Sequence, residues 1–298
     1  MTTALAPHPS ELAHARRASN RRARRQGSRT GNAVAAIAAW IIGLLFISPI
    51  VWMLLTSLHT EQVASSPTPK FIAPMSFDNY ANFFAGGGAI APILNSVIAS
   101  FSSTILVILL AIPAAYALSV RPVEKWTDVM FFFLTTKMLP LVAGILPIYL
   151  IAKQFGLLDN INLLVVLYTS MNLPIAIWML RSFLADIPVE LFEAAALDGA
   201  GLITTLRSVI VPIISPGIAA TALICFIFSW NELFLANRLA SGVVARTAPV
   251  YLGSFITGEG LFAAKLAAAA VIVSLPVLIA GFAAQDKLVQ GLSLGAVK

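Results

Sequence analysis

Residues 181–217 read RSFLADIPVELFEAAALDGAGLITTLRSVIVPIISPG, and this stretch decides the fold of the chain. Asp186 is placed to cap a short helix, and Pro188 suits the first turn of that helix. Gly199 can adopt the positive φ that ends it, and a second amphipathic stretch continues until Pro212 and Pro216. These residues predict a helix-turn-helix elbow. The elbow either docks against a soluble partner or packs as a structured loop on its own chain.

Long apolar runs lie on both sides of this elbow. A bilayer core needs about 20 apolar residues per helix, and six runs reach that length. Their approximate bounds are 33–56, 93–120, 129–152, 161–180, 213–235 and 261–284. The sequence therefore predicts an all-α integral membrane protein, with six transmembrane helices over residues 33–284. The elbow, at about residues 186–212, joins the fourth helix to the fifth.

The composition agrees with a membrane protein. Of the 298 residues, 59% are hydrophobic and only 11% are charged, where a soluble domain carries about 25% charged residues. The net charge of +6 comes from a tail at residues 1–32, in which only Glu11 opposes seven arginines. They are Arg16, Arg17, Arg21, Arg22, Arg24, Arg25 and Arg29. We expect this tail to be disordered and to flank the first span in the cytoplasm rather than to bind nucleic acid.

Lysine and arginine placement predicts the orientation of the chain. With the amino terminus inside, the inner segments hold the tail arginines and Arg121, Lys125, Arg181, Arg207, Lys287 and Lys298. The outer segments hold Lys70, Lys153, Arg238, Arg246 and Lys265. Because basic residues gather in cytoplasmic loops, this bias predicts that both termini, including a carboxy-terminal tail at residues 285–298, lie in the cytoplasm. The elbow then faces the cytoplasm as well.

The sequence offers no catalytic or cofactor motif. It contains neither GxxxxGKS nor GxxxxGKT, so it does not bind ATP by that loop. His8, His14 and His59 are scattered without metal-ligand spacing, and the single cysteine, Cys225, excludes an internal disulfide. We therefore expect no bound cofactor or metal and no enzymatic activity in this chain.

The elbow resembles the EAA loop of the permease subunits of binding-protein-dependent ABC importers. The residues that carry the resemblance are Glu193, Ala194, Ala195, Asp198, Gly199 and Ala200, followed by Pro212 and Pro216. The resemblance implies a type I importer permease fold, in which this loop docks into a cleft of the ATP-hydrolysing subunit. It also implies a second homologous permease as heterodimer partner, two ATPase subunits that bind ATP and Mg²⁺, and an extracytoplasmic binding protein.

Further stretches are similar to the maltose-permease-like branch of carbohydrate importers. They are NYANFF at 79–84, LNS at 94–96, FSWNELFLA at 228–236 and LVQGLSLGAVK at 288–298. In that branch the carboxy-terminal tail reaches between the ATPase subunits, and Gly291 and Gly295 would let it bend. TTKMLP at 135–140 looks most like permeases for sugar alcohols, while trehalose, maltodextrin or another glycoside stays open as the substrate.

Two polar regions inside the spans, one in the third and one in the fifth, are candidates for the substrate pathway. Lys137 lies well inside the third span, where a charge must face the bundle or a watery path. It either lines that path or forms a structural pair with a carboxylate. Trp230, Asn231 and Glu232 suit sugar hydroxyls, or they anchor the fifth span at the membrane interface.

Two other classes of protein remain as rivals. An ion-coupled secondary transporter would usually have more spans and repeated halves, and an integral membrane enzyme would need a catalytic constellation. Six spans and the EAA-like elbow favour the ABC permease over both.

Overall fold

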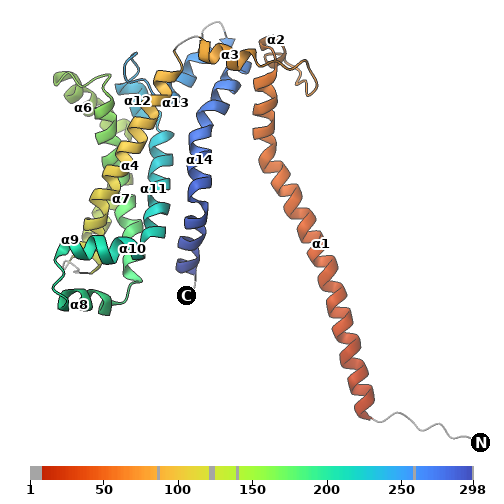
Figure 1. Cartoon of the computed structure of the whole chain (residues 1–298). Helices are drawn as coiled ribbons and strands as arrows, with labels where there is room; N and C mark the ends of the chain where they lie inside the picture. The colour runs from red at the N-terminus through yellow and green to blue at the C-terminus, as the bar shows by residue number, and fades with distance from the viewer. Residues whose placement is uncertain (1–8, 86–87, 121–124, 139–140, 258–259, 297–298) are drawn as a thin grey trace, which may run out of the picture. The chain divides into compact units, whose positions relative to one another are not determined.

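The computed structural model describes residues 9–85, 88–120, 125–138, 141–257 and 260–296 (Figure 1). It falls into two compact units, the first ending at Leu55 and the second beginning at Thr56. The sequence prediction divides the chain at residues 32 and 284, into an arginine-rich tail, a six-helix domain and a carboxy-terminal tail.

The first unit consists of most of α1 (Pro9–Leu58). Residues 9–32, which were predicted to be disordered, are helical in the structure. Alanine, arginine, glutamate and glutamine are good helix formers, and proline is favoured at the first helical position. The helix therefore continues unbroken from the arginine-rich stretch into the apolar span.

The second unit is built around α4 (Ile90–Ser119), α7 (Ile161–Ala185) and α11 (Ser215–Trp230), with α14 (Ala263–Ala296) against α11. α4 packs along α7, and α11 contacts both (Figure 1). Small buried side chains of α4, among them Ala111 and Ala115, face the larger Ile177 and Leu180 of α7 in one core cluster. Small residues let membrane helices approach closely, which explains why this pair forms the centre of the bundle.

Within the described residues, four helices are long and apolar enough to cross a membrane, or six if two bent pairs each count as one span. The four are Ala33–Leu58, Ile90–Ser119, Ile161–Ala185 and Ala263–Gln285. They confirm the first, second, fourth and sixth predicted spans to within a few residues. A mostly helical membrane fold is thus confirmed.

The third predicted span is bent, and the fifth begins at a sharp bend. The third consists of α5 (Trp126–Met138) and α6 (Leu141–Gln154), which meet at 86°. Pro140, which the sequence placed inside this span, lies outside the described residues. The fifth corresponds to Ser215–Trp230, and the preceding stretch Leu202–Ile213, which belongs to the elbow, meets it at 83°. Pro216, in the first turn of α11, suits a helix start but not a helix interior.

The fifth span also ends earlier than predicted. α11 stops at Trp230 rather than near residue 235, and α12 (Phe234–Leu239) begins after a short turn. Asn231 ends α11 by donating its side-chain amide to Ile227 O at 2.8 Å. An α-helix rises about 1.5 Å per residue, so the 16 residues of α11 cover less than a bilayer core.

Short elements connect the long helices. α2 (Glu61–Ala64) and α3 (Asp78–Ala85) lie between α1 and α4, and α13 (Ala248–Leu252) and the one-turn 3₁₀ helix η2 (Gly253–Phe255) precede α14. The strands β1 (Ile256–Thr257) and β2 (Gly260–Leu261) pair antiparallel, with Ile256 opposite Leu261 and Thr257 opposite Gly260. Glu61 accepts the backbone amides of Ala264 and Lys265, both at 3.3 Å, and so caps the start of α14.

The carboxy-terminal end differs from its prediction as well. α14 continues to Ala296, so Gly291 and Gly295 lie inside a helix rather than in a bent tail. Leu, Ala, Gln and Lys, which are frequent around both glycines, favour helix strongly enough to carry it through them.

Candidate functional site

The elbow forms as the sequence predicts. α8 (Val189–Leu197) ends where Gly199 takes a φ of +73°. The amides of Gly199 and Ala200 donate to Ala196 O at 3.1 Å and to Ala195 O at 3.0 Å, which satisfies the last carbonyls of the helix. Asp186, however, ends α7 instead of capping α8, and the position before α8 belongs to Pro188. Proline fixes the extended entry there without needing an amide partner.

The second arm of the elbow is also helical. It consists of α9 (Leu202–Thr204), a π-helical turn η1 (Thr205–Ile210) and α10 (Val211–Ile213). The backbone amide and the hydroxyl of Thr205 both donate to Gly201 O, at 2.9 and 3.1 Å. These bonds fix the corner at which α9 begins. π-helical turns are rare and recur at functional sites.

The motif residues divide between an inner and an outer face of the elbow. Ala195 is 8% exposed, and the ring of its neighbour Phe192 meets the Tyr116 ring of α4 edge-on at 6.1 Å. Glu193, Ala194, Asp198 and Gly199 are exposed, and Ala200 is half-buried. The inner face thus holds the elbow on the bundle, whereas both acidic motif residues are exposed on the isolated chain.

Large apolar side chains share this outer face. Leu197 is 89% and Ile203 is 79% exposed, one on each arm of the elbow. Neither position lies in a helix long enough to cross a membrane by itself, since α8 has nine residues and the stretch Leu202–Ile213 ends at the 83° bend before α11. Exposed apolar side chains beside exposed carboxylates are typical of a surface that another protein covers.

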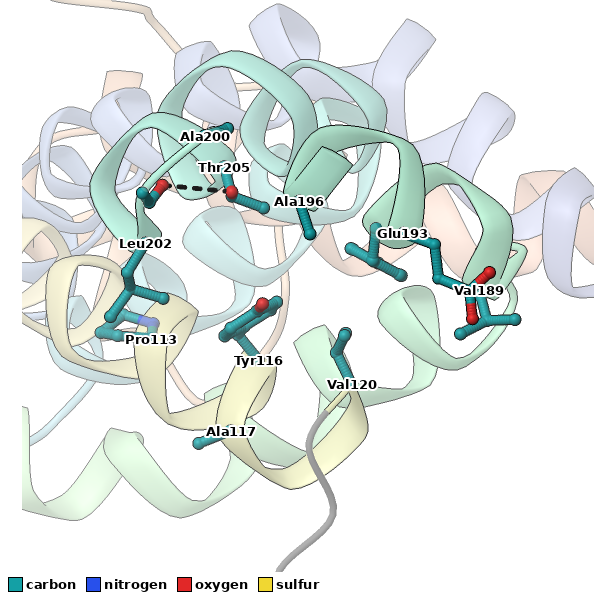
Figure 2. A pocket seen from close by; sticks show the side chains of 12 residues that line it. Pro113, Tyr116, Ala117, Val120, Val189, Glu193, Ala196, Ala200, Leu202 and Thr205 are labelled. Carbon is teal, nitrogen blue, oxygen red and sulfur yellow. Dashed lines mark hydrogen bonds between the residues drawn. The ribbon is translucent and has the colours of Figure 1, made fainter. Parts of the chain in front are cut away.

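A cavity of about 640 Å³ lies between the elbow and the last turns of α4. Tyr116 and Val120 line it from α4, Phe192 and Glu193 from α8, and Leu202 from α9 (Figure 2). Figure 2 shows Pro113 of α4 beside Leu202, while Val189 and Ala196 line the α8 side. The elbow therefore borders a hollow on one side, while its Phe192, Leu206 and Ile210 pack in the core cluster of the bundle.

Lys137 lines a second cavity, of about 280 Å³, between α5, α6 and α7. Thr136 and Ser170 add hydroxyls to its wall, and Met171, Pro174 and Leu235 add apolar surface. Lys137 itself is exposed on the isolated chain. This placement is compatible with either sequence interpretation, a lining of the pathway or a pair with a carboxylate of another subunit.

Trp230 and Glu232 make contacts inside the chain. Trp230 is 2% exposed, and its Nε1 donates to Val273 O of α14 at 3.2 Å. The Glu232 carboxylate, 8% exposed, accepts the amides of Leu235 at 2.8 Å and Ala236 at 3.1 Å. Trp230 thus joins α11 to α14, and Glu232 caps α12. Asn231 is exposed at the turn between them.

A buried polar network that the sequence analysis missed joins α4, α7 and α11. The Ser103 hydroxyl and the Asn172 amide both donate to Ser229 Oγ, at 3.1 and 3.0 Å. Ser100 Oγ and Asn172 Oδ1 are buried without a hydrogen-bond partner among the described residues. Isolated serines and one asparagine in otherwise apolar spans were the only available signal.

Side chains from two distant parts of the chain hold the segment at residues 244–248, where α13 begins. Asn95 donates its side-chain amide to Val244 O and Arg246 O, at 2.8 and 3.0 Å, and the neighbouring Ser96 Oγ accepts the Ala248 amide at 2.8 Å. These are the polar residues of the LNS stretch. Asp159, whose φ is +54°, accepts the Val244 and Ala245 amides at 3.1 and 3.0 Å. The start of α4 and the turn before α7 thus hold the same loop.

Comparisons with known proteins identify this architecture. Residues 107–293 match the family model of the binding-protein-dependent transport system inner membrane component. The chain is 38% identical to a putative ABC transporter permease protein ORF1 of Streptomyces antibioticus, over 69% of this chain and 90% of that protein. It is 31% identical to the trehalose transport system permease protein SugB of Mycobacterium tuberculosis, over 91% of this chain and 99% of that one.

The fold has a solved counterpart. The structure matches a crystal structure of a bacterial ABC transporter involved in the import of the acidic polysaccharide alginate, with a TM-score of 0.73. The match covers 87% of this chain and 97% of that one at 23% identity, so it concerns the fold alone. The chain belongs to the family of inner membrane components of binding-protein-dependent transport systems.

Family membership has direct consequences for function. The chain is a membrane permease subunit, and such a system also contains a substrate-binding protein and an ATPase. The matched region, residues 107–293, includes the elbow, both cavities, and Asn172 and Ser229 of the polar network, whereas Ser103 of that network lies just before it.

Proposed function

We propose that this chain forms half of the translocation pathway of an ATP-driven carbohydrate importer, and that the elbow couples it to an ATPase subunit. One observation carries the coupling role: Glu193, Leu197 and Asp198 are exposed, and they lie on or directly after a helix of nine residues, which is too short to be a membrane span. In this proposal Glu193 approaches a basic group of the ATPase, and Leu197 and Ile203 lie in its cleft.

The contacts behind the elbow suggest how a movement of the ATPase reaches the membrane. α8 touches α4 through the Phe192–Tyr116 ring contact, and α4 packs along α7 through the centre of the bundle. The cavity beside this contact leaves room for α8 to tilt. A displacement of α8 therefore moves the end of α4 first, and α4 passes it to α7.

Three groups anchor this end of the bundle. The Arg181 guanidinium of α7 lies 3.6 Å from the centre of the Trp126 ring, and its Nε donates to Leu118 O at 3.2 Å. The Ser119 hydroxyl donates to Arg181 O at 3.3 Å. Since cations are favourable at helix carboxyl ends, Arg181 holds α4 and α7 together while the elbow beside them moves.

The complete importer would contain this chain, a second homologous permease, two ATPase subunits that bind ATP and Mg²⁺, and an extracytoplasmic binding protein. Basic residues gather on the side that carries the elbow, which supports a cytoplasmic location for the elbow and for both termini. Gly291 and Gly295 would lie where the carboxy-terminal end of α14 meets the ATPase subunits. The arginine-rich start of α1 has no assigned role.

The substrate we propose is a carbohydrate. SugB, which this chain matches over almost the whole of its length, is named for trehalose transport, and the motif resemblance points to the maltose-permease-like branch. A polyol, trehalose, maltodextrin or another glycoside all fit. Lys137, in its cavity beside Ser170 and Thr136, is the residue we place on the substrate pathway, whereas the contacts of Trp230 and Glu232 favour structural roles.

Reconstitution tests this proposal. The chain would be expressed with the permease, ATPase and binding protein encoded beside its gene, purified by a tag on this chain, and placed in vesicles. We expect a complex with two different permeases, and binding-protein-dependent uptake of a carbohydrate that stops without ATP. Full ATP-dependent uptake by a homodimer would contradict the heterodimer, and uptake driven by an ion gradient alone would contradict the importer class.

A further inference from the structure

The chain between α1 and α4 carries an exposed apolar segment, which we call the 71–77 segment. Ile72 is 96% exposed, and Phe71, Met75 and Phe77 are also more than half exposed. Lys70 and Asp78 bound the segment, which contains no charge of its own and lies outside every helix. The cost of exposing apolar surface to water grows with its area, so some apolar medium or partner should cover these side chains.

Hydrogen bonds hold this segment at the end of a membrane span. The Ser76 amide donates to Leu58 O at 2.7 Å, and Leu58 is the last residue of α1. The Asn79 side-chain amide donates to Ser57 O at 2.9 Å and to His59 O at 2.8 Å. The segment therefore returns to the level where α1 ends instead of projecting away from it.

A second span reaches its end at the same level. Glu61, three residues after Leu58, caps the first turn of α14 through the Ala264 and Lys265 amides. α3, which follows the 71–77 segment, packs against α14. Figure 1 shows α3 at the opposite end of α4 from α8 and α9, which form the elbow. The 71–77 segment thus lies where two spans meet the membrane surface, on the side opposite the elbow.

We propose that the 71–77 segment is an interfacial membrane anchor, with Phe71, Ile72, Met75 and Phe77 inserted among the headgroups and upper acyl chains of the bilayer. Irregular backbone is not stable in the hydrocarbon region, because its amides and carbonyls need partners. At headgroup depth the backbone amides and carbonyls stay hydrogen-bonded to water, while the apolar side chains are buried in the acyl region. Lys70 and Asp78 then stay in the polar layer at either end.

Lipid suits this surface better than the two proteins that could also cover it. A binding protein docks and leaves in every transport cycle, and would leave four large apolar side chains in water between visits. A second permease would bury the segment permanently, but the segment is continuous with the ends of the membrane-crossing helices, where lipid is always present. This inference needs a bilayer but not the coupling role of the elbow, so either can fail alone.

Spin labels in the assembled importer test the anchor. The only cysteine, Cys225, is replaced by serine, and a nitroxide is attached at Ile72→Cys, at Met75→Cys, or at Gln62→Cys on the exposed side of α2 as the water control. The complex is placed in vesicles of phosphatidylethanolamine and phosphatidylglycerol without binding protein. Collision with oxygen, which dissolves in lipid, is compared with collision with a water-soluble nickel chelate.

We expect the labels at 72 and 75 to favour oxygen over nickel, as a spin-labelled phospholipid in the same vesicles does, while the label at 62 favours nickel. Adding the binding protein should leave the values at 72 and 75 unchanged. Nickel accessibility at 72 and 75 equal to that at 62, with or without protection by the binding protein, would overturn the anchor. So would labels that neither reagent reaches, because that result means burial by the second permease.

Discussion

The elbow and the turn at residues 230–232 both carry polar residues in a mainly apolar chain, yet they use them in opposite ways. In the elbow, Glu193 and Asp198 are exposed and accept no hydrogen bond from another described residue that would complete their contacts within the elbow. At the turn, Glu232 is buried and accepts two backbone amides, and Trp230 donates to α14. A polar residue whose contacts are completed within its own chain is explained by the fold, and one that faces outward beside exposed apolar side chains indicates a partner.

The largest effect should come from Gly199. A Cβ at Gly199 or at Gly201 would meet no atom within 4 Å, but only Gly199 has a positive φ, of +73°. Left-handed backbone costs a residue with a side chain about 1–2 kcal/mol. Gly199→Ala should therefore reduce coupled uptake by about tenfold, and Gly199→Val by more because it is β-branched. Uptake and ATPase recovery are measured on purified complexes.

Gly201→Ala is the matched control for the Gly199 variants. It adds the same methyl group two residues away, at a φ of −68° that any residue adopts, and should behave as wild type. Equal losses of uptake from Gly199→Ala and Gly201→Ala would mean that the added methyl group disturbs the cavity, and that the positive φ of Gly199 is not the cause.

Lys137 extends the comparison to a residue that lines a cavity and is exposed on the isolated chain. If it lines the pathway, Lys137→Met should assemble normally and take up substrate several-fold more slowly, with basal ATPase activity retained. If it pairs with a carboxylate of the partner permease, recovery of that permease should fall, because removing one member of a buried pair leaves an unpaired charge. Subunit recovery and uptake are scored separately.

Lys137→Arg is the control for charge and should be milder than Lys137→Met under either interpretation. Wild-type recovery together with wild-type uptake from Lys137→Met would exclude both roles, and would indicate that the ammonium reaches the membrane surface instead.

Glu232 should show a smaller effect, on stability and not on coupling. Glu232→Ala removes the acceptor of the Leu235 and Ala236 amides, and unmade hydrogen bonds of this kind cost about 1–3 kcal/mol each. We expect a lower thermal unfolding midpoint in detergent, with the apparent affinity for substrate unchanged in the folded fraction. Asn231→Ala, which loses only an exposed bond to Ile227, should change the midpoint little.

A different result would show that Glu232 has a functional and not a structural role. If Glu232→Ala keeps the wild-type unfolding midpoint but weakens apparent substrate affinity by tenfold or more, the carboxylate contacts substrate. The turn would then be part of the pathway.

Much of the fold could be predicted because membrane spans and the elbow are local signals. The apolar runs placed four helices correctly, and Gly199 ended α8 as its residue type requires. The bends of 86° and 83° could not be predicted, because proline marks where a helix can break and not by how much it turns. The run of like charges in the arginine-rich tail indicates disorder, whereas the helix propensity of its alanines and arginines favours the helix that α1 forms from Pro9.

The candidate site was predictable only where its residues are close in sequence. The six motif residues of the elbow fall within eight positions, from Glu193 to Ala200. The network of Ser103, Asn172 and Ser229 joins three helices over more than a hundred residues. The roles of Trp230 and Glu232 depend on their partners, Val273 and the first turn of α12, and residue type alone did not reveal those partners.

The central claim, that the exposed Glu193 of the elbow binds the ATPase, has a direct test in a pair of charge reversals on α8. Glu193→Lys and Glu190→Lys make the same change on one exposed helix, but only Glu193 belongs to the motif and lines the cavity. The measurement is the amount of ATPase that co-purifies with each membrane-inserted variant. We predict that Glu193→Lys loses at least about tenfold, as breaking an interfacial charge pair does, while Glu190→Lys retains nearly all. Normal amounts of ATPase and normal uptake with Glu193→Lys would contradict the account.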